Sequence, residues 1–320
     1  MEKYDIEKHG VTQSVLLNWL GCRERARLGL KGWSRSGFSP SMQYGEIFHG
    51  ALERVFKKVR DGKLTSAPSK DLLHKIVGKI VHEIEKRTDT VNDQGYELLE
   101  YNRAMAEAQL PTYFARYSKD FTHRKWVLLE TEFNIPIKTR DGIIIPFRGK
   151  IDAGFEQDKY FSLFETKTKS IIDTEALMDQ LHFDFQTTSY IYAAWKLGHP
   201  LARKVLYNVI RRPGLRKRKT ETIDAFMERV RKDIIIRKEF YFMRWEIAIT
   251  QTDIDKFMEE FEDIVTEFHR WYVGKLPNYR NTGSCQTKYG ACQYVGVCAR
   301  KDYKFLEKRE RVFPELGEIK

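Results

Sequence analysis

Apolar residues recur at helical spacing along several stretches of the chain and follow strand patterns along others. Helices are predicted over 12–30, 43–55, 70–88, 97–118, 173–197, 222–233 and 252–273. Strands are predicted over 126–138, over two segments between 143 and 169, and over 204–211 and 238–249. This mixture indicates an α/β fold with a mixed central β-sheet flanked by helices, and 56–122 is expected to form an inserted helical lobe.

Three polar residues interrupt the apolar pattern of the two strands between 143 and 169. They are Asp152, Glu165 and Lys167. We expect a four-residue turn over 156–159, which places Asp152 opposite Leu163 and diagonal to Glu165. Diagonal neighbours are roughly 7–8 Å apart, a distance that two carboxylates can span through one metal ion. A bound metal would offset the cost of burying these charges. The alternative is an ordinary hairpin whose polar residues face solvent.

The basic composition favours a polyanionic partner. The 320 residues carry a net charge of +11, and 42% of them are hydrophobic. Nucleic acid fits such a surface, although a soluble basic protein without that partner shows the same balance. The basic stretch 211–219 is either a phosphate contact or a solvated loop. Because no run of about 18 apolar residues exists and the N-terminus lacks an apolar signal core, we expect a cytoplasmic protein with no membrane contact.

Four short motifs follow one another in a fixed order. They are Tyr44-Gly45-x-x-x-His49, Gly149-x-x-Asp152, Glu165-x-Lys167 and Gln186-x-x-x-Tyr190. Each motif alone is weak, but the ordered set resembles the RecB-like branch of the PD-(D/E)xK nuclease superfamily over about 12–298. That branch includes the RecB and AddB nuclease domains, CRISPR-associated RecB-like exonucleases, exonuclease V and phage recombination nucleases. The resemblance implies one nuclease domain over 1–320 with a restriction-endonuclease-like core.

The resemblance also implies a site for Mg²⁺ or Mn²⁺. His49, Asp152, Glu165 and the main-chain carbonyl of Thr166 would bind the ion, a donor set that suits these metals. Lys167 would orient or deprotonate the attacking water, or neutralise developing charge. For His49 the alternative is a histidine that packs in the core.

Gln186 and Tyr190 lie one helical turn apart and share a helix face. The resemblance implies that this pair lines the site and touches DNA or the lysine, whereas ordinary helix packing is the alternative. Lys169 and Tyr192 are candidate substrate neighbours.

Four cysteines complete the set of candidate ligands: Cys22, Cys285, Cys292 and Cys298. In a cytosolic chain such a set favours metal ligation over disulfides. The resemblance implies a 4Fe–4S cluster in which 277–298 closes onto Cys22. The six residues between Cys285 and Cys292 depart from the tighter spacing of the family. A structural Zn²⁺ site and free buried thiols are the alternatives.

The sequence therefore predicts a metal-dependent DNA exonuclease that acts on single strands or DNA ends in recombination, repair or CRISPR-type processing. A structure-specific endonuclease is the alternative within the class, and a non-catalytic DNA-binding partner of a recombination complex is the alternative outside it. A helicase or a recombinase is a possible partner under either interpretation.

Overall fold

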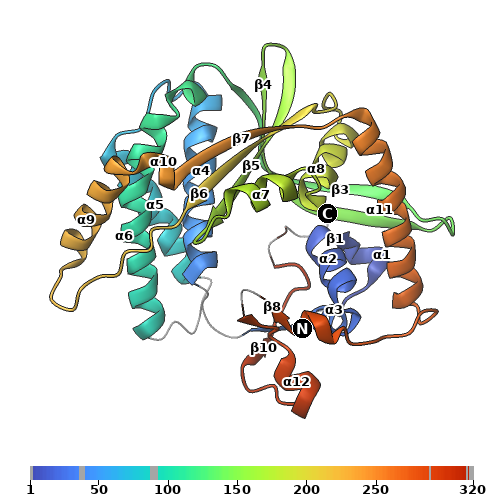
Figure 1. Ribbon diagram of the computed structural model, residues 1–320. Helices are drawn as coiled ribbons and strands as arrows, with labels where there is room; N and C mark the ends of the chain where they lie inside the picture. The colour runs from blue at the N-terminus through green and yellow to red at the C-terminus, as the bar shows by residue number, and fades with distance from the viewer. Residues whose placement is uncertain (1–2, 36–39, 87–92, 288–289, 315, 317–320) are drawn as a thin grey trace.

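The computed structural model describes residues 3–35, 40–86, 93–287, 290–314 and 316. Its centre is a six-stranded mixed sheet, with helices on both faces (Figure 1). The predicted α/β class with a mixed sheet is thus confirmed. Among the described residues, no helix combines the length and apolar content needed to cross a membrane.

The sheet has the order β1-β4-β5-β6-β7, and β3 pairs with the other edge of β4. The strands are β1 (Val11–Thr12), β3 (Lys125–Lys138), β4 (Ile144–Gln157), β5 (Tyr160–Lys169), β6 (Lys204–Arg211) and β7 (Phe242–Ala248). The β1–β4 and β5–β6 pairs are parallel, and the β3–β4, β4–β5 and β6–β7 pairs are antiparallel. Two small ribbons join β2 (Trp33–Arg35) to β10 (Leu306–Lys308) and β8 (Gln286–Thr287) to β9 (Gly290–Ala291).

The helices fall into two groups around this sheet (Figure 1). One core cluster joins the sheet to α4 (Pro40–Arg60), α5 (Lys70–Lys86), α6 (Asp93–Arg116) and α9 (Ile223–Ile236). The other joins it to α1 (Ile6–His9), α2 (Gln13–Gly21), α3 (Arg23–Leu30), α7 (Thr174–Leu181), α8 (Phe185–Lys196) and α11 (Gln251–Tyr272). The remaining helices are η1 (Ser118–Phe121), α10 (Lys238–Tyr241), η2 (Thr282–Ser284) and α12 (Val295–Arg300).

Three predicted elements are each divided in two. The helix predicted over 12–30 breaks at Cys22, whose backbone is extended. The helix predicted over 173–197 is α7 followed by α8, and Asp184 stands just before the second helix. The strand predicted over 238–249 begins with the short helix α10. Apolar residues occur on both sides of each break, so periodicity alone did not reveal it. Residues 87 and 88 of the helix predicted over 70–88 lie outside the described residues.

The turn between β4 and β5 is shorter than the predicted four residues. Gln157 pairs with Tyr160, which leaves only Asp158 and Lys159 between the strands. Both of these residues have positive φ, as a two-residue hairpin turn of the primed type requires. The register therefore shifts by two residues, and the pairing of Ala153 with Phe164 brings Asp152 level with Glu165 instead of Leu163.

Gly149 is needed because a phenyl ring crosses directly over its backbone. A Cβ atom at Gly149 would lie 2.6 Å from Cζ of Phe133, the residue that pairs with it on β3. The Phe133 ring is buried between Phe147 and Tyr190, at centroid distances of 5.1 and 5.8 Å, so it has little room to move. The glycine thus fixes the packing of Tyr190 from α8 against the sheet.

We predict that Gly149→Ala destabilises the protein by about 1–3 kcal/mol, the usual cost of overpacking a core. Urea denaturation measures the change in the free energy of unfolding. Gly214→Ala is the matched control, because nothing lies within 4 Å of a Cβ at Gly214. Equal stability of the two variants would show that the Phe133 ring moves freely.

Candidate active site

The site forms where β4 loses its partner strands along one edge. On that edge β4 pairs with β5 as far as Ala153, and with β1 only at Phe147 and Arg148. Asp152 lies between these two ladders. Its Oδ2 accepts a hydrogen bond from the backbone N–H of Thr166 on β5, at 3.0 Å. The Asp152 side chain is 17% exposed, so its carboxylate remains accessible to a further partner.

Helix α4 brings His49 to this edge. A Cβ at Gly45 would lie 2.9 Å from Oγ1 of Thr168, so the glycine allows the helix to approach β5 closely. One turn later, Nδ1 of His49 lies 3.5 Å from Oδ2 of Asp152. The two residues come from motifs about a hundred positions apart, and the structure brings them together.

Glu130 on β3 is a third member of this group, and the sequence analysis missed it. Its Oε1 lies 3.9 Å from Nδ1 of His49, and its Oε2 lies 2.6 Å from Nζ of Lys150. The backbone at Glu130 has a φ of +45°, rare for a residue with a side chain. The same strand also carries Glu132 and Asn134, so the sequence contained no signal that separates Glu130 from an ordinary polar residue of the strand.

Lys167 lies at the centre of a second set of contacts. Its Nζ lies 2.8 Å from Oε1 of Glu165 and 4.0 Å from Oδ2 of Asp184, and it donates a 2.6 Å hydrogen bond to Oε1 of Gln186. Gln186 in turn donates to the Tyr190 hydroxyl at 3.3 Å. The predicted residues of β5 and α8 therefore meet at one amine.

Burial and neighbouring charges shift the pKa values of the acidic and basic side chains in the site. Burial, reinforced by the neighbouring Glu130, raises the pKa of Asp152 to about 7. Burial and the charge of Asp152 raise the pKa of Glu165 to about 8. Burial works against the charge of Lys167, but Glu165 and Asp184 outweigh it and hold the lysine pKa above its usual range. Lys167 is therefore a cation at neutral pH.

The donor set fits a hard divalent cation. One ligand atom from each of His49, Glu130 and Asp152 lies within 4.8 Å of the other two. Burial lowers the pKa of His49 despite the nearby glutamates, which keeps the imidazole in its neutral, metal-binding form. A cation here would compensate carboxylates that burial otherwise drives toward protonation. Oxygen donors with one imidazole suit Mg²⁺ or Mn²⁺.

A family model of the PD-(D/E)XK nuclease superfamily matches residues 12–299. The chain belongs to this superfamily. Eighteen solved chains are similar to it, and among them is the crystal structure of SSO0001. That structure is 13% identical over 80% of this chain and 85% of its own length, with a TM-score of 0.28, too low to argue from. No curated protein matches.

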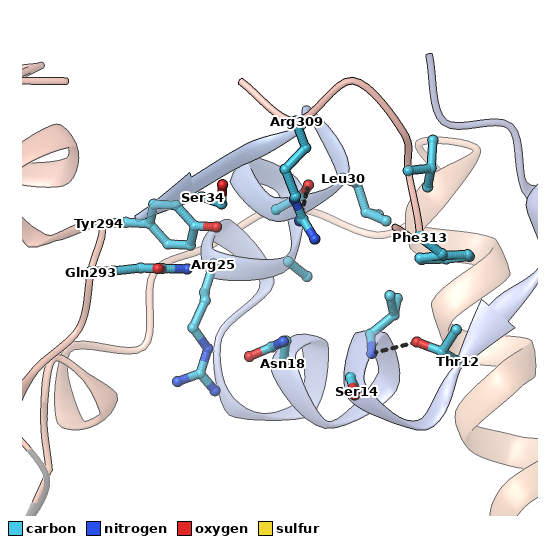
Figure 2. Close-up of a pocket in the computed structure, with 14 residues that line it drawn as sticks. Thr12, Ser14, Asn18, Arg25, Leu30, Ser34, Gln293, Tyr294, Arg309 and Phe313 are labelled. Atoms are coloured by element: carbon cyan, nitrogen blue, oxygen red, sulfur yellow. Dashed lines mark hydrogen bonds between the residues drawn. The ribbon is translucent and has the colours of Figure 1, made fainter. Parts of the chain in front are cut away.

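A second cavity of about 200 Å³ lies where α2 and α3 meet the C-terminal segment, with Arg25 and Arg309 among its lining residues (Figure 2). Its lining includes no aspartate, glutamate or histidine. The cavity beside His49 contains the carboxylates instead. For a nuclease of this superfamily, the site at His49 is therefore the candidate active site.

The C-terminal segment docks around Cys22. The Cys22 sulfur accepts a hydrogen bond from the Asn281 N–H at 3.4 Å, and Ser284 donates to the Gly21 carbonyl at 2.8 Å. The backbone N–H of Cys292 donates to the carbonyl of Cys285 at 2.9 Å. Among the described residues, however, no three thiols lie within 4.8 Å of one another. The structure therefore does not confirm the predicted iron–sulfur cluster, nor does it show a site for a single zinc ion.

We predict that Asp152→Asn stabilises the metal-free nuclease at pH 8–9, on the order of 2–4 kcal/mol. Because the folded-state pKa of Asp152 is raised, its protonated carboxyl stabilises the folded protein, and this stabilisation is complete below the unfolded pKa of about 4. It is lost as the pH rises through about 7, where the folded carboxyl ionises. Asparagine does not ionise, so the variant keeps its stability. Thermal unfolding in EDTA between pH 5 and 9 measures the difference.

With saturating Mn²⁺ the wild type should become more stable than Asp152→Asn, because the wild type gains metal-binding free energy that the variant lacks. A variant less stable than the wild type at pH 9 in EDTA would contradict the charge burial described above.

Proposed function

We propose that the protein is a metal-dependent DNA exonuclease of the RecB-like branch, with single strands or DNA ends as substrates. The observation that carries the proposal is the contact of His49 with Asp152, whose carboxylate accepts a hydrogen bond from the N–H of Thr166, the residue between Glu165 and Lys167 on β5. A protein that only binds DNA has no need for such a costly group of buried charges.

The first role we assign to the side chains is metal binding. His49, Asp152, Glu165 and the carbonyl of Thr166 would hold Mg²⁺ or Mn²⁺, with Glu130 as a further candidate ligand. When bound, such an ion activates water and stabilises the charge that develops on the phosphate.

Lys167 orients the attacking water and neutralises negative charge through its ammonium group, because its raised pKa keeps it protonated. Gln186 and Tyr190 hold the amine in place from α8. The substrate phosphate would then lie next to the lysine, on the side that β4 leaves open.

DNA as the substrate is supported by charge and location. The net charge is +11, and Lys169 lies two residues beyond Lys167 on the same strand. On the neighbouring strand β6, Lys169 pairs with Arg211. These cations continue from the site along the end of the sheet and can contact successive phosphates. A helicase or recombinase partner in the cytoplasm remains a prediction from the sequence.

We predict that Lys167→Ala and Asp152→Ala each reduce DNA cleavage by about 10²-fold or more, because each removes a charge from the reaction centre. The measurement is digestion of end-labelled linear single strands with Mg²⁺, Mn²⁺ or EDTA. Lys125→Ala is the matched control, since Lys125 is an exposed strand lysine paired with Glu156 at the surface.

Closed circular single strands test the mode of cleavage in the same assay. An exonuclease leaves them intact, whereas a structure-specific endonuclease cuts them. Wild-type cleavage rates in the Lys167→Ala protein would refute the assigned role of the amine.

We also propose that Cys22, Cys285, Cys292 and Cys298 bind a 4Fe–4S cluster, with structural Zn²⁺ as the alternative. Support comes from the docking of the C-terminal segment around Cys22. Burial raises the pKa of Cys298, and the nearby charges of Glu24, Cys292 and Cys22 raise it further. Cys22 and Cys292 are therefore near enough to Cys298 to influence its charge, although the described thiols form no close group.

We predict that protein purified without oxygen is brown and contains iron, and that Cys285→Ser loses both the colour and part of its thermal stability. The stability falls because the cluster ties together two distant parts of the chain. Iron analysis and thermal unfolding provide the measurements. Ser284→Ala is the control, since it removes a neighbouring hydrogen bond and keeps every thiol. Colourless protein with stoichiometric zinc would establish the alternative.

A further inference from the structure

Two large apolar side chains, one on each side of α7, are almost completely exposed. Ile171 precedes the helix and is 85% exposed, and Phe183 follows it and is 87% exposed. The helix between them is well packed, with Leu177 and Leu181 in the core. Single exposed apolar residues are common on protein surfaces, so their neighbours decide whether these two have a role.

Phe183 lies next to the residues that contact the active-site amine. The following residue, Asp184, places its Oδ2 4.0 Å from Nζ of Lys167. Two residues further on, Gln186 accepts a hydrogen bond from the same amine. The backbone that carries Phe183 is therefore tied to the reaction centre through its immediate neighbours.

Ile171 lies next to basic residues at the end of the sheet. The carbonyl of Lys169, two residues earlier, accepts a hydrogen bond from the backbone N–H of Arg212 at 2.9 Å. The carbonyl of Ile172 accepts one from the Arg211 guanidinium at 3.5 Å. Positive charge thus stands beside one exposed apolar residue, and the catalytic lysine stands near the other.

An unpaired nucleic acid strand matches this combination of charge and exposed apolar surface. Its phosphates complement Lys169, Arg211 and Arg212, and its bases offer flat apolar faces that a duplex would keep stacked inside. A protein partner would also cover apolar side chains, but it would not account for their place beside the phosphodiester chemistry.

We propose that Phe183 stacks on an unpaired base next to the scissile phosphate, and that Ile171 contacts another base further along the same strand. This inference rests on the proposed nuclease function and makes its substrate specific: the strand must be unpaired where it crosses α7. Phe183 is then a positioning residue that holds the strand against the site.

Binding of a labelled single-stranded oligonucleotide in EDTA tests the proposal without cleavage. Loss of one stacked base is worth about 1–3 kcal/mol, so Phe183→Ala should weaken binding about 5- to 150-fold. Phe183→Trp, which keeps an aromatic ring, should bind the oligonucleotide about as tightly as the wild type. Phe305→Ala is the matched control, because Phe305 is 68% exposed and lies in the C-terminal segment away from α7.

Ile171→Ala should also weaken binding of the oligonucleotide. Its control is Ile236→Ala on α9, where the side chain is 78% exposed.

Two further measurements separate stacking from other causes. An oligonucleotide with 2-aminopurine should show quenched fluorescence on wild-type protein and recovery on Phe183→Ala. Hydrolysis of a small phosphodiester, bis(p-nitrophenyl) phosphate, by the wild type with Mn²⁺ tests the chemistry separately, because the ester has no strand to position. Wild-type affinity and quenching in Phe183→Ala would overturn the proposal. Absence of hydrolysis by the wild type would count against the nuclease function alone, since binding is measured separately.

Discussion

The structure depends on holding three carboxylates close together at one interrupted sheet edge, with Glu165 buried and Glu130 and Asp152 partly buried. Glu130, Asp152 and Glu165 come from three neighbouring strands, and together they would repel one another strongly in a medium that screens charge poorly. Two lysines relieve part of this cost: Lys150 pairs with Glu130, and Lys167 pairs with Glu165. Among the described residues, the groups in contact with the Asp152 carboxylate are the Thr166 amide and the His49 imidazole, and no ammonium forms an ion pair with it. The carboxylate without its own ammonium partner is thus the one placed to take a cation.

Two glycines allow the elements that carry these charged residues to pack closely. Gly45 and Gly149, the glycines of two motifs, stand where a Cβ would meet the Thr168 hydroxyl or the Phe133 ring. The first allows α4 to approach β5, and the second leaves room for the Phe133 ring of β3 over the backbone of β4. Their role is steric, because the chemistry belongs to residues three and four positions further along. A motif of this type therefore encodes a distance between elements as well as a set of ligands.

The sequence was sufficient for the fold class, because alternation and helical spacing are local properties. Glu165 and Gln186, two of the candidate site residues, do contact Lys167, but Asp184 was not singled out. The sequence was not sufficient for the hairpin register, since two positive-φ residues, Asp158 and Lys159, shortened the turn. It also did not reveal the breaks at Cys22 and before α8, because helix-forming residues lie on both sides of each break. Glu130 was missed because its role depends on the close approach of β3 and α4, which no pattern along the chain records.

The cysteine region and the catalytic site are mechanically connected through α2. The C-terminal segment holds the end of this helix at Gly21 and Cys22. Within the helix, Trp19 packs against Phe268 and Trp271 of α11. Helix α2 also contacts α8, the helix that carries Gln186 and Tyr190. A metal cluster or ion bound by the cysteines would therefore restrain α2 and, through its contact with α8, the helix that positions the Lys167 amine. Such an arrangement explains how a site far from the chemistry can support it: it fixes the packing against which the catalytic residues are aligned.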